Sequence, residues 1–179
     1  LPQFVKSLAP DWVVDSLDLE VSPPTDLADD FNWRSFLQRL RQRYYSFVHY
    51  QPPCGSYANI RNANDGGPRP LRGPEGPERF GIKYSSPPLR PHEAETLRMG
   101  TLLALRSLEG MSLQVELGIP FSFETPMPRP GGTSITNFDE YRKLITHPGV
   151  VAKEVDQCTL GSKGTKATLL TLFKVQDES

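Results

Sequence analysis

The residues best suited to chemistry form one short segment, Gln51-Pro52-Pro53-Cys54. A Pro-Pro pair after a buried strand fixes the backbone and presents the next side chain outward, which suits a flipped base or another planar substrate. That side chain carries the Cys54 thiol, and thiols become nucleophiles where a neighbouring cation or a helix N-terminus favours the thiolate. No basic partner is local, because alternation along the strand points His49 to a different face. A proline-stiffened turn with an inert cysteine is an equally good interpretation.

Glu124 is the second candidate, because it stands near the end of a predicted strand, immediately before Thr125-Pro126. A carboxylate at that position can hold the amino or ring-nitrogen edge of a base. A glutamate at a strand end is, however, more often only solvated. Both interpretations stay open on the sequence.

Metal and nucleotide-loop chemistry find little support. The histidines His49, His92 and His147 show no metal-ligand spacing, and no carboxylate cluster accompanies them. Lys163 and Lys166 lie in a Gly-containing stretch that lacks the Gly-x-x-x-x-Gly-Lys-Ser/Thr order of a nucleotide-binding loop. We therefore expect no metal site, and a solvated turn around these lysines.

Strand-like and helix-like segments alternate around these candidates. Strands are predicted at Trp12–Val21, Tyr45–Tyr50, Ile119–Thr125, Val150–Val155 and Thr168–Val175. Helices are predicted from Asp29 or Asp30 to Tyr44, from His92 to Leu117 with Gly118 as C-cap, and from Asn137 to Ile145. This order favours an α/β fold with one mostly parallel sheet of about five strands, flanked by helices, in a single domain over residues 1–179.

The predicted sheet would gather the candidate side chains at one edge. In open parallel sheets, ligands bind beyond the carboxyl ends of the strands. The loops after Val21, Tyr50, Thr125 and Val155 should therefore lie together. They contribute Asp26 and Asp29, Pro52-Pro53-Cys54, Glu124, and Asp156-Gln157-Cys158.

A long segment from Cys54 to Pro91 has many Gly and Pro residues and little periodicity, as functional or disordered loops do. It is locally basic, although the whole chain has a formal net charge of −1. A contact with nucleic acid would therefore have to be local. The residues expected to make it are Arg61, Arg69, Arg72 and Arg79.

The composition indicates the cellular compartment and bears on whether the chain spans a membrane. Only two cysteines are present, Cys54 and Cys158, which is too few for a secreted disulfide framework and predicts a reducing compartment, the cytoplasm or the nucleus. No apolar run approaches the roughly 20 residues that a membrane span needs, and the first residues lack the pattern of an export signal.

Several segments in a fixed order carry a resemblance to a known family. They are LDLEV, DLADD, FVHYQPPCGSYANIRN, GGPRPLRGPEGP, FSFETP and DQCTLGSKGTKATLL, between Leu17 and Leu170. In this order they resemble the methyltransferase-like domains of eukaryotic retroelements, which look like class I S-adenosylmethionine-dependent DNA methyltransferases. The resemblance implies an incomplete Rossmann-like methyltransferase fold.

The resemblance also implies roles for individual residues. Glu20 would lie near the ribose of S-adenosylmethionine and Asp26 near its adenine, with Pro52 and Pro53 beside the cofactor. Cys54 would attack a cytosine ring, and Glu124 would hold the base. If Cys54 is not a nucleophile, the Pro-Pro backbone would position an exocyclic amine for direct methyl transfer, so the target atom stays open.

The chain departs from this family at its front. Such enzymes begin with a Gly-rich turn at the cofactor, and here no glycine precedes Gly55. The chain is then either part of a longer protein or a domain that has lost its cofactor. Two functions follow as hypotheses: a methyltransferase-like domain that acts on or binds nucleic acid, and a non-catalytic subunit of a larger protein assembly.

Overall fold

The computed structural model describes residues 11–20, 22–57, 68–82, 87–156 and 167–174. The chain divides into two compact units, Leu1–Phe36 and Leu37–Ser179, and the boundary falls inside a helix. The single domain expected over residues 1–179 stays a prediction. None of the helices in the described ranges is long and apolar enough to cross a membrane.

The strand predicted at Trp12–Val21 is wrong, because the described part of that stretch contains no strand. The Asp18 carboxylate accepts a hydrogen bond from the backbone N–H of Glu20 (3.1 Å), and the Asp18 carbonyl accepts one from Thr25 (2.9 Å). Such local bonds offer the backbone an alternative to a sheet ladder. The chain therefore turns at Asp18, and Val13 remains 91% exposed.

The first helix, α2 (Asp30–Arg41), confirms the helix expected from Asp29 or Asp30. Asp29 caps it, because its Oδ1 accepts hydrogen bonds from the backbone N–H groups of Phe31 (2.9 Å) and Asn32 (3.0 Å). The helix ends three residues before the expected Tyr44, and Arg43 there adopts a left-handed conformation with φ 54°.

The second unit contains one mixed sheet with the strand order β1-β2-β4-β3. Its strands are β1 (Val48–Tyr50), β2 (Phe121–Pro126), β3 (Val150–Asp156) and β4 (Ala167–Phe173). Only β1 and β2 are parallel, while β4 runs antiparallel to both of its neighbours. The predicted mostly parallel, Rossmann-like sheet is therefore wrong, although the four strands lie close to the expected positions.

The lengths of the connections explain this mixed sheet. Parallel strands need a crossover of a dozen or more residues, and α3 (Pro91–Leu117) supplies one between β1 and β2. Residues 157–166 alone separate β3 from β4, which is short for a crossover and sufficient for an antiparallel neighbour. The prediction of a mostly parallel sheet therefore failed at the connection from β3 to β4, for which no helix was predicted.

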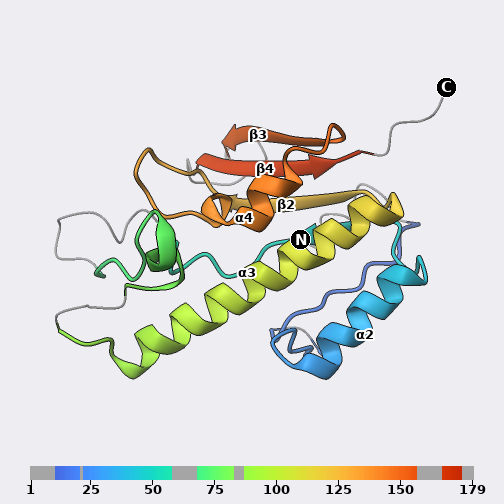
Figure 1. Ribbon diagram of the computed structural model, residues 1–179. Helices are drawn as coiled ribbons and strands as arrows, with labels where there is room; N and C mark the ends of the chain where they lie inside the picture. Colours follow the sequence, from blue (N-terminus) through green and yellow to red (C-terminus); the bar gives the residue numbers. More distant parts are fainter. Residues whose placement is uncertain (1–10, 21, 58–67, 83–86, 157–166, 175–179) are drawn as a thin grey trace. The chain divides into compact units, whose positions relative to one another are not determined.

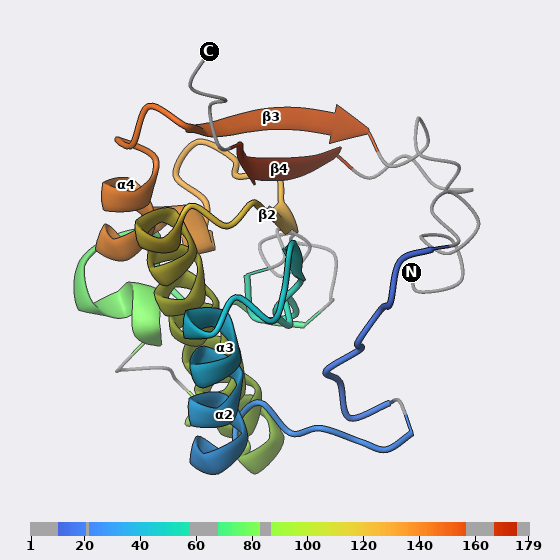
Figure 2. The ribbon, with the colours of Figure 1, turned by 90° about the vertical axis from the view of Figure 1, so that its right-hand side faces the viewer.

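Two helices, α3 and α4 (Asp139–Leu144), lie on the same face of the sheet (Figures 1 and 2). From this face the Tyr50 hydroxyl donates to Gln114 Oε1 of α3 over 2.5 Å. The Tyr141 hydroxyl of α4 lies 2.8 Å from Thr171 Oγ1 of β4. The core between the layers includes Phe121, Phe123, Leu108, Met111 and Phe173, all at most 5% exposed.

Short helical turns complete the second unit. A 3-10 helix, η2 (Gly76–Phe80), lies within the long basic loop, and η3 (Ile135–Asn137) precedes α4. Asn137 does not cap α4 as expected, because Phe138 occupies the cap position. The Asn137 side chain instead donates to the carbonyls of Pro74 (2.8 Å) and Gly132 (3.0 Å), so it joins two loops.

Helix α3 is continuous through both of its internal glycines, and Gly118 ends it in a left-handed conformation as predicted, with φ 67°. A Cβ at Gly110 would lie 2.6 Å from the Tyr50 hydroxyl, and one at Gly100 would lie 2.7 Å from Ser56 Oγ. The glycines therefore let β1 and its following loop approach the helix closely.

We expect Gly110→Ala to destabilise the fold by roughly 1–3 kcal/mol, measured by urea unfolding, because the added methyl displaces Tyr50. The steric clash outweighs the gain of about 1 kcal/mol that alanine brings to a helix interior. In a Tyr50→Phe background the same substitution should cost less, since the closest atom is the hydroxyl. A Gly110→Ala protein as stable as the wild type would contradict the close packing.

Candidate functional site

The parallel pair β1–β2 brings the two predicted site segments together. His49 lies opposite Ser122 and Tyr50 opposite Phe123, so Gln51 and Glu124 follow at the same level. Because β2 and β3 both run antiparallel to β4, the carboxyl ends of β1, β2 and β3 lie at one edge of the sheet. The strand ends that precede three of the four expected loops therefore lie at one edge, and the loop after Val21 follows no described strand.

Alternation gives this strand pair one apolar and one polar face. Tyr50 and Phe123 point into the core beneath α3. On the opposite face, the Gln51 Nε2 group donates a hydrogen bond to Glu124 Oε2 over 3.1 Å. On that same face His49 Nδ1 lies 2.7 Å from Ser122 Oγ. We call these four side chains, His49, Gln51, Ser122 and Glu124, the polar face.

The surroundings of the His49 ring shift its pKa. Burial of the ring is the largest effect and lowers the pKa of His49 below its usual value of 6.5. The negative charge of Glu124 acts in the opposite direction and raises it. His49 and Glu124 are therefore electrostatically coupled.

The loop after β1 carries the remaining predicted residues. Pro52 is buried, Pro53 is exposed and Cys54 is half-buried. The backbone N–H of Tyr57 donates to the Cys54 carbonyl over 2.8 Å, which closes a turn directly after the cysteine. The thiol and the Glu124 carboxylate thus come from the ends of adjacent strands.

Arg72 fixes this turn against α3. Its side chain is 2% exposed, and its guanidinium lies 4.1 Å from the centre of the Tyr57 ring. It donates to Ser56 Oγ (3.0 Å), to the Leu97 carbonyl (2.9 Å) and to Thr101 Oγ1 (2.9 Å). Arg72 therefore has a structural role close to the Cys54 loop.

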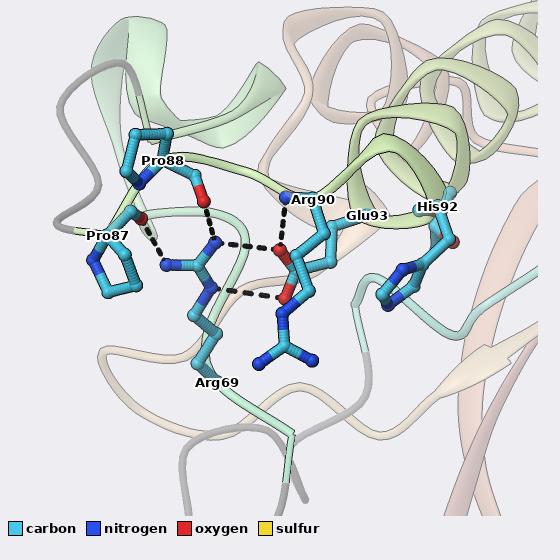
Figure 3. A network of polar contacts seen from close by, with 7 residues as sticks. Arg69, Pro87, Pro88, Arg90, His92 and Glu93 are labelled. Carbon is cyan, nitrogen blue, oxygen red and sulfur yellow. Dashed lines mark hydrogen bonds and ion pairs between the residues drawn. The ribbon is translucent and has the colours of Figure 1, made fainter.

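Arg69 connects the basic loop to the start of α3 (Figure 3). Its Nη2 group lies 2.7 Å from Glu93 Oε2, and its guanidinium also donates to the carbonyls of Pro87 and Pro88. Glu93 additionally accepts from the backbone N–H of Arg90 over 2.8 Å. These bonds lower the pKa of Glu93 to about 2, with the Arg69 side chain as the main cause.

Arg79 is engaged in a similar way, with Asp139 of α4 at 2.5 Å and the Asn137 carbonyl at 3.2 Å. Arg61 lies outside the described residues, as do Cys158, Lys163 and Lys166. The proposed contacts of Arg61, Arg69, Arg72 and Arg79 with nucleic acid stay a prediction. The three described arginines each bind parts of their own chain.

The residues expected around S-adenosylmethionine do not fit that cofactor. Glu20 is exposed in the turn at Asp18 and ends no strand. Asp26 Oδ1 accepts from the backbone N–H of Ala28 over 2.8 Å, within the turn that precedes α2. Residues 1–54 contain no glycine, so none of them forms the Gly-rich turn that the resemblance implies. No step through S-adenosylmethionine follows from these residues.

Sequence reasoning missed His49 and Ser122 as neighbours of Glu124. The signal is the alternation of aromatic and polar residues in VHYQ and in FSFE, which predicts one polar face on each strand. Only the register of the pair places the two faces side by side.

No protein-family model, curated protein or solved structure matches the chain. Within the described ranges, no group of three or more His, Cys, Asp or Glu side chains could hold a metal ion. The site is therefore interpreted from its own geometry.

We expect Arg72→Lys to lower the free energy of unfolding by about 2 kcal/mol or more, because an ammonium group cannot replace the forked hydrogen bonds of a buried guanidinium. Thermal or urea unfolding measures this loss. Arg98→Lys is the matched control, since Arg98 forms an exposed pair with Glu95 at 2.7 Å. The control should change stability by less than about 0.5 kcal/mol; equal effects in both variants would contradict the anchoring role.

The Glu93 pair predicts a dependence of stability on pH. Its pKa is lowered in the fold from 4.5 to about 2, so its stabilisation is complete above 4.5 and is lost as the pH falls through 2. The difference in melting temperature between wild type and Glu93→Gln should be constant at neutral pH and shrink towards pH 2. A difference that is the same at every pH would contradict this assignment.

Proposed function

We propose that this chain is a domain that binds an unpaired nucleobase at the edge formed by Gln51–Cys54 and Glu124, which is the nucleic-acid-binding part of the function that the resemblance implies. The observation that carries the proposal is the hydrogen bond from Gln51 to Glu124, which connects the ends of two parallel strands. The family resemblance implies the same pairing of a Pro-Pro-Cys loop with a base-holding glutamate.

The side chains at this edge suit the rim of an amino-bearing base. The Glu124 carboxylate can accept a hydrogen bond from the exocyclic amine of cytosine or adenine, which thymine lacks. Pro53 is exposed and offers an apolar surface to a planar ring, while the buried Pro52 stiffens the backbone before it. A base inside a duplex cannot reach such a site, so the ligand is single-stranded or carries an extruded base.

Methyl transfer is not part of this proposal. Attack on a ring by Cys54 and direct transfer to an amine would both need a methyl donor, and Glu20 and Asp26 do not fit S-adenosylmethionine. The two cysteines of the chain support placement in a reducing compartment, the cytoplasm or the nucleus.

A subunit of a larger protein assembly is the second candidate function. The arginines Arg69, Arg72 and Arg79 bind their own chain, which reduces the support for a broad phosphate-binding surface. In addition, β3 is an outer strand whose residues 151–154 are exposed. Exposed outer strands can pair with other chains.

We expect single-stranded oligonucleotides of deoxycytidine or deoxyadenosine to bind more tightly than those of thymidine, measured by fluorescence anisotropy. Glu124→Leu should weaken binding of the amino-bearing oligonucleotides roughly tenfold, since it removes a charged acceptor. Glu116→Leu, on the exposed side of α3, is the matched control with the same change in net charge.

Three further arms separate the alternatives. Cys54→Ala should keep the preference for amino-bearing bases, because binding does not use the thiol. Saturable binding of S-adenosylmethionine in calorimetry, with S-adenosylhomocysteine beside it, would contradict the poor fit of Glu20 and Asp26. If the folded wild type binds none of the oligonucleotides, the assembly subunit becomes the better conclusion.

A further inference from the structure

The polar face contains a histidine that the proposed base binding does not use. His49 lies opposite Ser122 on β2, and Glu124 is two residues further along the same strand and on the same face. His49 is thus the diagonal neighbour of Glu124 across the strand pair. It lies two residues before Gln51, where the 51–54 loop begins. It can act on a ligand at that edge through Glu124.

Ser122 is the partner that allows His49 to exist in two protonation states. A hydroxyl can donate to a neutral ring nitrogen and can accept from a protonated one. The distance of 2.7 Å from His49 Nδ1 to Ser122 Oγ is therefore compatible with both states. Ser122 is only 6% exposed, which limits the competition of water for this contact.

Few other groups face His49 within the described part of the sheet. Gln51, directly after β1, and Ser122 of β2 are neutral, and β4 contributes Leu170 and Leu172 to this face by register. Lys153 of β3 shares the face but lies beyond β4. Among the described residues, Glu124 is a carboxylate on this face whose negative charge stabilises the imidazolium.

We infer that the protonation state of His49 controls the affinity of the base site, and that binding of an amino-bearing base at Glu124 releases a proton from protonated His49. This inference rests on the proposed function. A ligand amine that donates to Glu124 weakens the field that this carboxylate exerts on His49. The imidazolium then loses stabilisation and the proton leaves to solvent.

Thermodynamic linkage determines whether the affinity for the ligand rises or falls with pH. If ligand binding favours neutral His49, protonation of His49 must disfavour ligand binding by the same factor. Affinity is therefore full above the pKa of His49 in the free protein and falls as the pH drops through it. For a coupling of ordinary size the loss is roughly fivefold.

The first experiment needs no ligand. The imidazole C–H signals of the three histidines are followed by NMR against pH, with His49 assigned through His49→Gln. In Glu124→Gln the midpoint of His49 should move to lower pH, because the carboxylate no longer stabilises the imidazolium. His92, exposed at the start of α3, is the internal control and should not move. An unchanged His49 midpoint would overturn the inference.

The second experiment measures binding of a deoxycytidine oligonucleotide between about pH 5.5 and 8.5, the range in which a histidine titrates. The wild type should lose affinity on acidification and release protons in calorimetry in buffers of different ionisation enthalpy. His49→Gln keeps a hydrogen-bonding side chain opposite Ser122, and it should bind as the wild type does at pH 8.5 with a flat profile below it. His92→Gln should retain the wild-type profile.

The possible outcomes distinguish the role of His49 from the proposed function. Binding whose pH profile is the same in wild type and His49→Gln would overturn the role of His49 and leave the proposed function intact. No binding by the folded wild type at pH 8.5 would contradict the proposed function, and the linkage with it. In that case the NMR midpoints still report whether His49 and Glu124 are coupled.

Discussion

The parallel pairing of β1 with β2 is the constraint on which the rest of the site depends. The strand β1 has only three residues, Val48–Tyr50, and it holds its place through the ladder to β2 and through the buried bond from Tyr50 to Gln114. Without this pairing, Gln51 would not meet Glu124 and His49 would not meet Ser122. A short strand thus brings His49 and Gln51 to Ser122 and Glu124 of β2, with α3 as its support.

Local sequence patterns predicted the elements of the second unit well. The strands around Tyr50, Phe123, Val150 and Thr171 and the long helix ending before Gly118 follow from alternation, helical spacing and glycine chemistry. The direction of the strands could not be predicted from local patterns, because it depends on which strands become neighbours. The strand β4 inserts between β2 and β3, which makes the sheet mixed, and no local pattern marks that choice.

The candidate site was predictable in part for the same reason. The special chemistry of Pro52-Pro53-Cys54 and the strand-end position of Glu124 can be recognised from residue types alone. The role of the arginines could not be predicted from residue types. A basic loop has the same composition whether its arginines bind phosphates or donate hydrogen bonds to carbonyls of the same chain. Arg72 illustrates this point, because its surroundings come from Ser56, Leu97 and Thr101, which are distant along the chain.

The two internal glycines of α3 fix the spacing of two contact points for the Cys54 loop. Gly110 receives Tyr50 and Gly100 receives Ser56, so the two ends of the loop rest on points ten residues apart, about 15 Å along a straight helix. One residue inserted between the glycines would rotate one docking point by about 100° relative to the other. The shape of the loop is therefore encoded in a helix far from it in sequence.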